Sequence, residues 1–596
     1  MKQHSKEKRM KIEKKNFAWD LIPGILLFAF LPLIVKAKLV QTHLDGYSWF
    51  SAEELQYDFF MYWKGAFFLI LVLWMAVVLV DRCLIRGHHA FGLKKFLPLI
   101  IYGILAVIST VFSVNRTLSL HGAWQHYESI WILLGYMVTV YYCFIMAGDK
   151  KNLRILSGAL CLGALFQSIF GILQFTGKDF FRSKAGRSLI TLGENTALGE
   201  SLKFDFAQNG RNSVYMASYN PNYAGVYVIL LWPILFYLGL EVKERWKKII
   251  CMTVTAALLI CLIGSGSKTG LLILAVQIII LAILKIRKSG KWWKLLIIFA
   301  MLLGGLICYD AANGHVLQKA INNIIPRQQS YALEEISPEK DSVRICFKGH
   351  RIDLSAMHTE KGDTLTALNE KGKSLPVVWD IEKQRFYIKK KGFYSLSFDA
   401  FVENGVANIY IFYNKTVLHF QKRSAEDPYV YITQFGKEAE ITTAPAVLKG
   451  WEKALTGRGY IWGRTIPLLK NCVLWGSGPD TFIVEFPQTD YVTRANIGPR
   501  MFFEIPSKAH CMYLQTALQT GMLSLICLLV FWLKYINGYL KLEKNNNAGP
   551  SLKRGIFLGI AGYLLMGFLN DSVLAVAPVF WGILGLGMGT GSSTHN

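Results

Sequence analysis

The sequence predicts an all-α polytopic membrane protein, with about 12 transmembrane helices and a β-rich insert on the outer side of the membrane. Two observations predict this class. Hydrophobic residues make up 53% of the 596 residues, and apolar runs of about 17 to 25 residues, long enough to cross the hydrocarbon layer, recur along the chain. One long polar stretch, residues 311–510, interrupts these runs.

The apolar runs divide the chain into membrane and non-membrane parts. We expect transmembrane helices centred on residues 21–36, 65–81, 96–113, 130–147, 155–175, 223–240, 249–264, 270–286, 295–309, 512–533, 555–570 and 573–590. Four regions result: a basic N-terminus over 1–17, helices over 18–310, an external loop over 311–511, and helices with the C-terminus over 512–596. The first run resembles a signal peptide, but no small-x-small cleavage site follows it, so we expect an uncleaved span.

Basic residues give the chain a formal charge of +25, and their placement orients it in the membrane. They gather in short loops at alternate ends of the expected helices: Lys2–Lys15, Arg82–Lys95, Lys150–Arg154, Lys243–Lys248, Lys285–Lys294 and Lys541–Arg554. Short cytoplasmic loops carry such an excess. We therefore expect both termini in the cytoplasm and residues 311–511 outside, and the charge needs no nucleic-acid partner.

Within the external loop, residues 340–440 change character. Gln384–Ile388, Phe393–Phe398 and Val406–Tyr413 alternate apolar with polar residues and are bounded by Gly, Asn or Lys, which is the pattern of antiparallel strands. We expect a β-sandwich-like domain here, followed by a motif-bearing segment over 450–511. Alternating Phe and Tyr residues more often fill a sandwich core than bind sugar, but both uses remain open.

Three short motifs follow one another in a characteristic order. An arginine precedes an Ile-Trp pair in Thr456–Trp462, a Gly-x-Gly-Pro turn with a following aromatic residue lies in Trp475–Phe482, and a histidine opens a Tyr-Leu-Gln helix in Ala509–Gln515. In this order, with a long external loop before the histidine, the chain resembles the O-antigen ligase and polymerase superfamily of membrane glycosyltransferases. Further matching segments are Asn220–Gly225, Gly264–Gly270 and Asn570–Pro578.

The resemblance implies a GT-C-like enzyme of the bacterial cytoplasmic membrane that acts at its outer face in cell-surface polysaccharide biosynthesis. Such an enzyme transfers a glycan from an undecaprenyl-diphosphate-linked oligosaccharide donor to an acceptor hydroxyl. The acceptor is a second lipid-linked glycan for a polymerase, and a lipid core, protein or wall polymer for a ligase; the residues do not separate the two. This chemistry needs cations for the diphosphate leaving group and a base for the attacking hydroxyl.

Three basic residues of the motifs are candidates for diphosphate binding. Arg458 comes first, because a guanidinium keeps its charge and offers a planar fork of donors to phosphate oxygens. The alternative is a surface arginine that neutralises lipid headgroups or a nearby acid such as Glu452. Arg464 is either an assisting cation or a solvated side chain. Lys268 stands where the family pattern usually has an arginine, so it supplies a point charge without the fork, or it snorkels to the interface.

His510 is the candidate catalytic base, because an unperturbed imidazole has a pKa of about 6.5 and suits proton removal near neutral pH. A lone histidine is otherwise usually a polar cap on a helix. Asn220 and Asn222 are candidates for binding sugar hydroxyls, although Asn-Pro-Asn is also ordinary turn chemistry and the turn is favoured. Tyr513, in the histidine motif, is the remaining sugar-binding candidate.

We expect no cofactor, and the lack of an external Asp-x-Asp cluster predicts a metal-independent reaction. The ten cysteines show neither CxxC spacing nor a disulfide framework, so a structural zinc site is not expected. The alternative function is a polytopic transporter or flippase for an anion or a lipid-linked glycan. That function would place charged or broken helices at the bilayer midplane, whereas the notable polar residues here gather at one external face.

Overall fold

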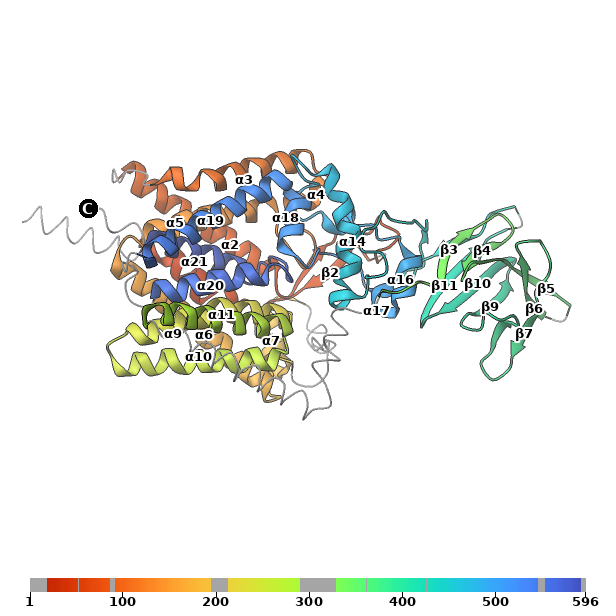
Figure 1. Ribbon diagram of the computed structural model, residues 1–596, viewed down its shortest axis with the longest axis horizontal. Helices are drawn as coiled ribbons and strands as arrows, with labels where there is room; N and C mark the ends of the chain where they lie inside the picture. Colours follow the sequence, from red (N-terminus) through yellow and green to blue (C-terminus); the bar gives the residue numbers. More distant parts are fainter. Residues whose placement is uncertain are drawn as a thin grey trace, which may run out of the picture.

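The computed structural model is an elongated molecule with a helical bundle at one end and a β-sheet domain at the other (Figure 1). Short helices lie between the two parts. The structure describes residues 19–51, 53–85, 92–194, 213–289, 328–360, 362–424, 426–544 and 552–590.

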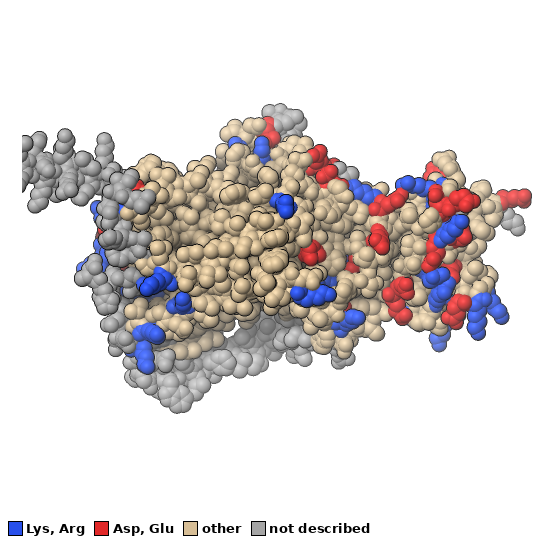
Figure 2. Space-filling view, turned by 90° about the horizontal axis from the view of Figure 1, so that it is seen from above, with Lys and Arg blue, Asp and Glu red and all other residues tan. Residues whose placement is uncertain are grey.

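Long apolar helices form the bundle. They are the first helix Trp19–Leu33, α2 (Tyr62–Val80), α3 (Leu93–Val111), α5 (Ile130–Met146), α6 (Lys150–Phe175), α9 (Pro221–Glu241), α10 (Arg245–Ser265), α11 (Lys268–Ser289), α19 (Met522–Lys544), α20 (Leu552–Met566) and α21 (Ala577–Gly589). Within the described residues, six helices are long and apolar enough to cross a membrane: α2, α3, α6, α9, α10 and α19. Few charged side chains lie on the bundle surface in Figure 2, whereas acidic and basic side chains crowd the β domain. These features indicate a membrane protein.

Shorter helices complete the α-helical part. They are α4 (Arg116–His121), α7 (Lys184–Ile190), α14 (Arg458–Leu468), α15 (Phe482–Glu485), α16 (Tyr491–Ile497), α17 (Pro499–Phe503) and α18 (Met512–Thr520). Helices overlap every expected span that falls in the described residues, and the expected span 295–309 lies outside them.

Small residues let some bundle helices approach closely. A Cβ atom added at Gly585 of α21 would lie 2.3 Å from the backbone oxygen of Val140 in α5, and one added at Gly559 of α20 would lie 2.3 Å from that of Leu230 in α9. Close backbone packing of this kind is typical of helices in membranes, where dispersion contacts rather than water exclusion hold helices together. In the α5–α21 and α9–α20 pairs, the helix backbones therefore pack directly against each other.

The expected single span 512–533 is wrong in one respect, because a break at Gly521 divides it into α18 and α19. The non-helical segment Cys472–Gly478 fills this break. The Met522 and Leu523 amides donate to the Cys472 and Val473 carbonyls at 2.8 and 3.1 Å. In the other direction, the amides of residues 477 and 478 donate to the last carbonyls of α18 at 2.8 and 2.9 Å. The helix ends are thus satisfied by another part of the chain, which hydropathy cannot reveal.

A second non-helical segment, residues 213–220, enters the bundle before α9. Residues 214 to 218 are buried, and polar side chains of neighbouring helices satisfy their backbone. Gln167 accepts from the Ala217 amide at 3.0 Å, and Gln174 accepts from the Met216 amide at 2.7 Å. The fully buried Lys64 donates to the Ala217 carbonyl at 2.9 Å. Irregular backbone is tolerated inside a bundle only when such partners are supplied.

The β domain confirms the expectation of strands in this region. Its strands are β3 (Leu333–Pro338), β4 (Val343–Phe347), β5 (His350–Thr359), β6 (Gly362–Asn369), β7 (Val377–Asp380), β8 (Arg385–Ile388), β9 (Ser397–Glu403), β10 (Val406–Tyr413), β11 (Thr416–Lys422), β12 (Val430–Ile432) and β13 (Glu438–Ala439). They form two antiparallel sheets, of order β3-β4-β5-β6 and β13-β12-β11-β10-β9-β8-β7. A separate pair, β1 (Lys38–Gln41) and β2 (Leu55–Asp58), lies elsewhere in the chain.

The two sheets share one core, to which alternate residues such as Ile409 and Ile411 of β10 contribute. The expected strand over 393–398 is displaced, because β9 begins only at Ser397. Phe393 and Leu396 are nevertheless buried, at 1% and 0% exposure. Their apolar side chains enter the core from a turn, and this explains why the sequence pattern resembled a strand.

Candidate functional site

His510 and Asp571 form a polar pair at the end of the bundle that faces the β domain. His510 lies just before α18 with a φ of 50°, and Asp571 lies in the turn between α20 and α21. The imidazole Nδ1 is 2.9 Å from the Asp571 Oδ2. The Met512 amide donates to the Gly567 and Asn570 carbonyls at 2.8 and 3.0 Å, which fixes the start of α18 against this turn. With Nδ1 engaged, Nε2 is the nitrogen that the ring offers to a substrate.

The two side chains of the pair differ in exposure. His510 is 38% exposed and Asp571 only 1%. Burial alone would raise the pKa of Asp571, but His510, Lys508 and Arg458 outweigh burial and hold the pKa of this carboxyl below its ordinary value. Asp571 therefore stays ionised, and it can orient the imidazole and stabilise its protonated form.

Arg458 lies on the other side of the same turn. It opens α14 directly after Gly457, whose φ is 96°. Its Nη2 donates to the Leu569 carbonyl at 2.8 Å, and its Nη1 lies 3.1 Å from the Thr456 hydroxyl. Its buried Nε has no hydrogen-bond partner among the described residues, and the same is true of Asp571 Oδ1. Buried polar atoms without partners are uncommon, so both atoms have unused capacity at this site.

Lys508 is a second cation of the site and is almost fully buried, at 2% exposure. Its Nζ donates to the Ser572 carbonyl at 3.0 Å and lies 3.9 Å from Glu128 Oε2. Glu128 Oε1 accepts from the Ser572 hydroxyl at 2.7 Å and from the Tyr136 hydroxyl at 2.9 Å. Lys508 and Glu128 therefore hold the turn that bears Asp571 from two directions.

Asp480 connects the Gly-x-Gly-Pro turn with the same region. Its Oδ2 accepts from the Ala123 and Glu128 amides at 2.7 and 3.0 Å. Burial raises the pKa of Asp480 to about 7, against the opposing charge of Lys508. Burial also lowers the pKa of His126 well below the usual value, with Lys508 and His510 adding to this effect. The carboxyl of Asp480 thus fixes the loop before α5 to the Gly-x-Gly-Pro turn, and its raised pKa lies near neutral pH.

Lys268 comes from a different helix from these residues. It is the exposed first residue of α11. Its neighbour Ser267 packs against Gly225, with the Ser267 Oγ 2.8 Å from where a Cβ would stand. Within the described part of the chain, no hydrogen bond or ion pair joins Lys268 to His510 or Arg458.

The three sugar-binding candidates have structural contacts. Asn220 is the N-cap of α9, and its Oδ1 accepts from the Asn222 amide at 2.9 Å. This is the turn geometry that the Asn-Pro-Asn sequence favours. The Tyr513 hydroxyl donates to the Leu564 carbonyl at 2.7 Å, and its ring packs against Phe568. None of these contacts tests a role in sugar binding.

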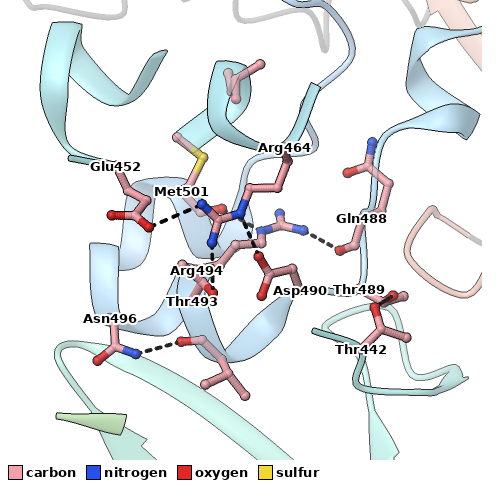
Figure 3. A network of polar contacts seen from close by, with 12 residues as sticks. Thr442, Glu452, Arg464, Gln488, Thr489, Asp490, Thr493, Arg494, Asn496 and Met501 are labelled. Atoms are coloured by element: carbon pink, nitrogen blue, oxygen red, sulfur yellow. Dashed lines mark hydrogen bonds and ion pairs between the residues drawn. The ribbon is translucent and has the colours of Figure 1, made fainter. Parts of the chain in front are cut away.

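Arg464 belongs to a separate buried network, shown in Figure 3. Its Nε is 3.0 Å from Asp490 Oδ2, and its Nη1 is 3.2 Å from Glu452 Oε1. All three side chains are at most 4% exposed. Arg494 lies beside them and donates to the Gln488 and Met501 carbonyls at 2.6 and 2.9 Å. Arg464 is thus held in a buried ion-pair network, and it is this arginine, not Arg458, that pairs with Glu452.

An apolar groove opens near the site. It has a volume of about 430 Å³ and is lined by Tyr62, Gly65, Ala66, Leu69, Leu120, His121, Tyr127, Ser129, Trp131 and Ile132. These residues come from α2, α4 and the start of α5, on both sides of Glu128 in sequence. The groove therefore lies between bundle helices, next to the loop that carries Glu128.

The sequence motifs made candidates of His510 and Arg458 but assigned no role to Asp571, Lys508 or Asp480. Asn570-Asp571 and the Gly-x-Gly-Pro-Asp turn had been recognised only as parts of the resemblance. Burial and partners separate such residues from ordinary polar loops, and one sequence does not contain that information. Within the described residues, no group of three or more His, Cys, Asp or Glu side chains is placed to hold a metal ion.

Comparison of the chain with protein-family models, with curated proteins and with solved structures gave no match.

Proposed function

We propose that the chain is a membrane glycosyltransferase of the O-antigen ligase and polymerase type. It transfers a glycan from an undecaprenyl-diphosphate-linked donor to an acceptor hydroxyl. The observation that carries the proposal is the His510–Asp571 pair at 2.9 Å, with Arg458 and Lys508 around the same turn. A base oriented by a buried carboxylate and set among cations suits the removal of a proton beside a departing diphosphate.

In the proposed reaction, His510 Nε2 takes the proton of the acceptor hydroxyl. The hydroxyl oxygen then bonds to the anomeric carbon of the donor, while the bond from that carbon to the diphosphate oxygen breaks. The electron pair leaves with the diphosphate, so its negative charge grows in the transition state. Asp571 stabilises the imidazolium that forms, as an orienting carboxylate does in catalytic triads.

Arg458 is the proposed main ligand of the diphosphate. Its Nε carries an unused donor, and a guanidinium binds phosphate oxygens with directed hydrogen bonds. Lys508 is held by Ser572 and Glu128, so its contribution is a fixed positive charge. Lys268 remains a proposed additional cation for the donor. Arg464 is not included, because two buried carboxylates already neutralise it.

The groove between α2 and α5 is the proposed site of the lipid part of the donor. The residues that line it are mainly apolar, and the groove has a volume of about 430 Å³, which suits several isoprenoid units. Because the groove lies beside the Glu128 loop, a lipid held there would carry its diphosphate toward the turn with Asp571. The remaining isoprenoid units would lie in the bilayer.

The proposal includes the membrane arrangement. It comprises about 12 spans in a GT-C-like architecture in the bacterial cytoplasmic membrane, both termini in the cytoplasm and the β domain outside. Lys94 and Lys95 at the start of α3, and Lys541 and Lys544 at the end of α19, support this orientation. In both helices, the basic end is then cytoplasmic and the opposite end lies toward His510.

The test uses the purified full chain with a defined lipid-linked oligosaccharide and candidate acceptors. Products are analysed for released diphosphate lipid and for new glycosidic bonds. We expect His510→Ala to bind donor and lose turnover, and Arg458→Ala to bind donor more weakly. His358→Ala is the matched control, because His358 also contacts a carboxylate, Asp363 at 2.6 Å, but lies in the β domain. A chelator should leave the rate unchanged.

Two results would contradict the proposal. If both site variants turn over at the wild-type rate, His510 and Arg458 are not the reaction centre. If donor crosses a vesicle membrane without forming a glycosidic bond, the chain is a transporter.

A further inference from the structure

An exposed apolar segment lies beside the external ends of α3 and α19. Val473, Leu474 and Trp475 are 51%, 56% and 42% exposed, although all three are large apolar residues. They precede the Gly-x-Gly-Pro turn that carries Asp480. Contiguous exposed apolar residues mark a surface that can contact lipid or another apolar partner; what singles this segment out is its position beside two bundle helices.

The segment is rigid rather than a mobile loop. The Val473 carbonyl accepts from the Leu523 amide at the start of α19, and the Gly476 amide donates to Ser109 Oγ of α3 at 2.7 Å. A Cβ added at Gly476 would lie 2.4 Å from the Leu518 carbonyl oxygen, so the backbones are in close contact here. The outward direction of the three apolar side chains is therefore built into the fold.

The segment continues the lipid-facing surface of α3. Exposed apolar residues run along this helix and past its end: Leu93, Leu97, Ile100, Ile101, Ile104, Val107, Val111, Phe112 and Val114. The Phe112 and Trp475 rings stack, with centroids 5.3 Å apart and an angle of 28°. The exposed face of α19 begins next to them, at Met522 and Leu523.

Helix length places this contact at the membrane surface. α3 has 19 residues and so extends about 28 Å, close to the thickness of the hydrocarbon core. With Lys94 and Lys95 at the cytoplasmic side, Phe112 and Trp475 lie at the outer boundary, where tryptophan is enriched in membrane proteins. The exposed Lys470 and Arg116 lie close by in sequence.

We propose that Val473–Trp475 inserts into the outer leaflet at the lipid headgroup boundary and anchors the Asp480 turn to the membrane. The inference rests on the membrane placement proposed above, and it adds a lipid contact to a segment outside the spans. The bilayer, rather than a second copy of the chain, is the occupant, because the segment extends the surface that α3 already presents to lipid.

The test places p-benzoylphenylalanine in the full chain at position 474, and in separate variants at 104 and 381. The protein is reconstituted in phosphatidylglycerol and phosphatidylethanolamine vesicles and irradiated, and adducts are identified by mass spectrometry. Ile104 is the bilayer reference, 55% exposed on α3, and Ile381 is the aqueous reference, 81% exposed in the β domain. Position 473 replaces 474 if the latter variant does not fold.

We expect lipid adducts at 474 and 104 and none at 381. Adducts at 104 without adducts at 474 would overturn the inference and leave the membrane placement intact. A crosslink from 474 to a second copy of the chain would also overturn it. Loss of lipid adducts at both 104 and 474 would overturn the placement of α3 and the inference together.

Discussion

Replacement of Asp571 by Asn tests how the buried carboxylate supports His510. The change removes one negative charge and keeps the size of the side chain and an oxygen that can still accept from the imidazole. Asp571 is 1% exposed and 2.9 Å from His510 Nδ1, so water and salt screen this interaction little. We expect the neutral amide to hold the ring in place but to stabilise the imidazolium less.

The magnitude follows from the type of hydrogen bond. A hydrogen bond to a charged group contributes about 1.5 to 3 kcal/mol, and each 1.4 kcal/mol of barrier changes a rate about tenfold. We therefore expect Asp571→Asn to lower kcat by about 10- to 100-fold. Donor affinity should change by less than about threefold, because Arg458 keeps its bond to the Leu569 carbonyl.

The assay measures initial rates of diphosphate-lipid release at saturating donor, and donor binding separately. Asp20→Asn is the matched control, since Asp20 is also 1% exposed and lies 2.9 Å from its cationic partner Arg82. It reports the general cost of neutralising a buried paired carboxylate. If Asp571→Asn and Asp20→Asn have the same kcat, the proposed support of His510 is refuted.

Three further predictions concern stability and substrate range. Burial raises the pKa of Asp480 to about 7, so between about pH 4 and 7 the folded carboxyl holds a proton that the unfolded chain releases, and the wild type loses at most about 4 kcal/mol of stability as the pH rises. Asp480→Asn should remove this loss. Melting temperatures of both proteins at pH 5 and pH 8 check this, and the same difference between the two pH values in both proteins would contradict it. Arg464→Met should destabilise the fold by about 3 to 5 kcal/mol, since Glu452 and Asp490 stay buried without a cation; a melting temperature equal to the wild type would disprove this. Ala66→Trp should fill the groove and raise KM for donors with a long isoprenoid chain but not for donors with a short one. Equal effects on KM for both donors would show that the groove does not bind the lipid part of the donor.

The sequence predicts the helices well because their signal is local. An apolar run of sufficient length needs no knowledge of its neighbours, and the expected spans in the described residues coincide with helices. The break at Gly521 escaped prediction because the groups that satisfy it belong to Cys472–Gly478, far away in sequence. The displaced start of β9 has the same cause, since Phe393 is buried by tertiary packing and not by strand pairing.

The candidate site was predictable where a motif marked it and not where burial defined it. His510 and Arg458 stand in short motifs and meet at one turn in the structure. Lys508 and Glu128 look like ordinary loop residues, and only the fold brings them together across a large sequence separation. Arg464 is a different case: its motif position left an assisting cation or a solvated side chain open, and its burial between two carboxylates excludes the solvated side chain.

The most direct measurement of the central claim is single-turnover release of diphosphate lipid from vesicles that contain the protein in known orientation. Donor is supplied only in the leaflet on the side of the β domain, and wild type is compared with His510→Gln. The account predicts release matched by an equal amount of new glycosidic bond in the wild type, and loss of both in the variant. Release that needs donor in the opposite leaflet, or that His510→Gln leaves unchanged, would contradict it.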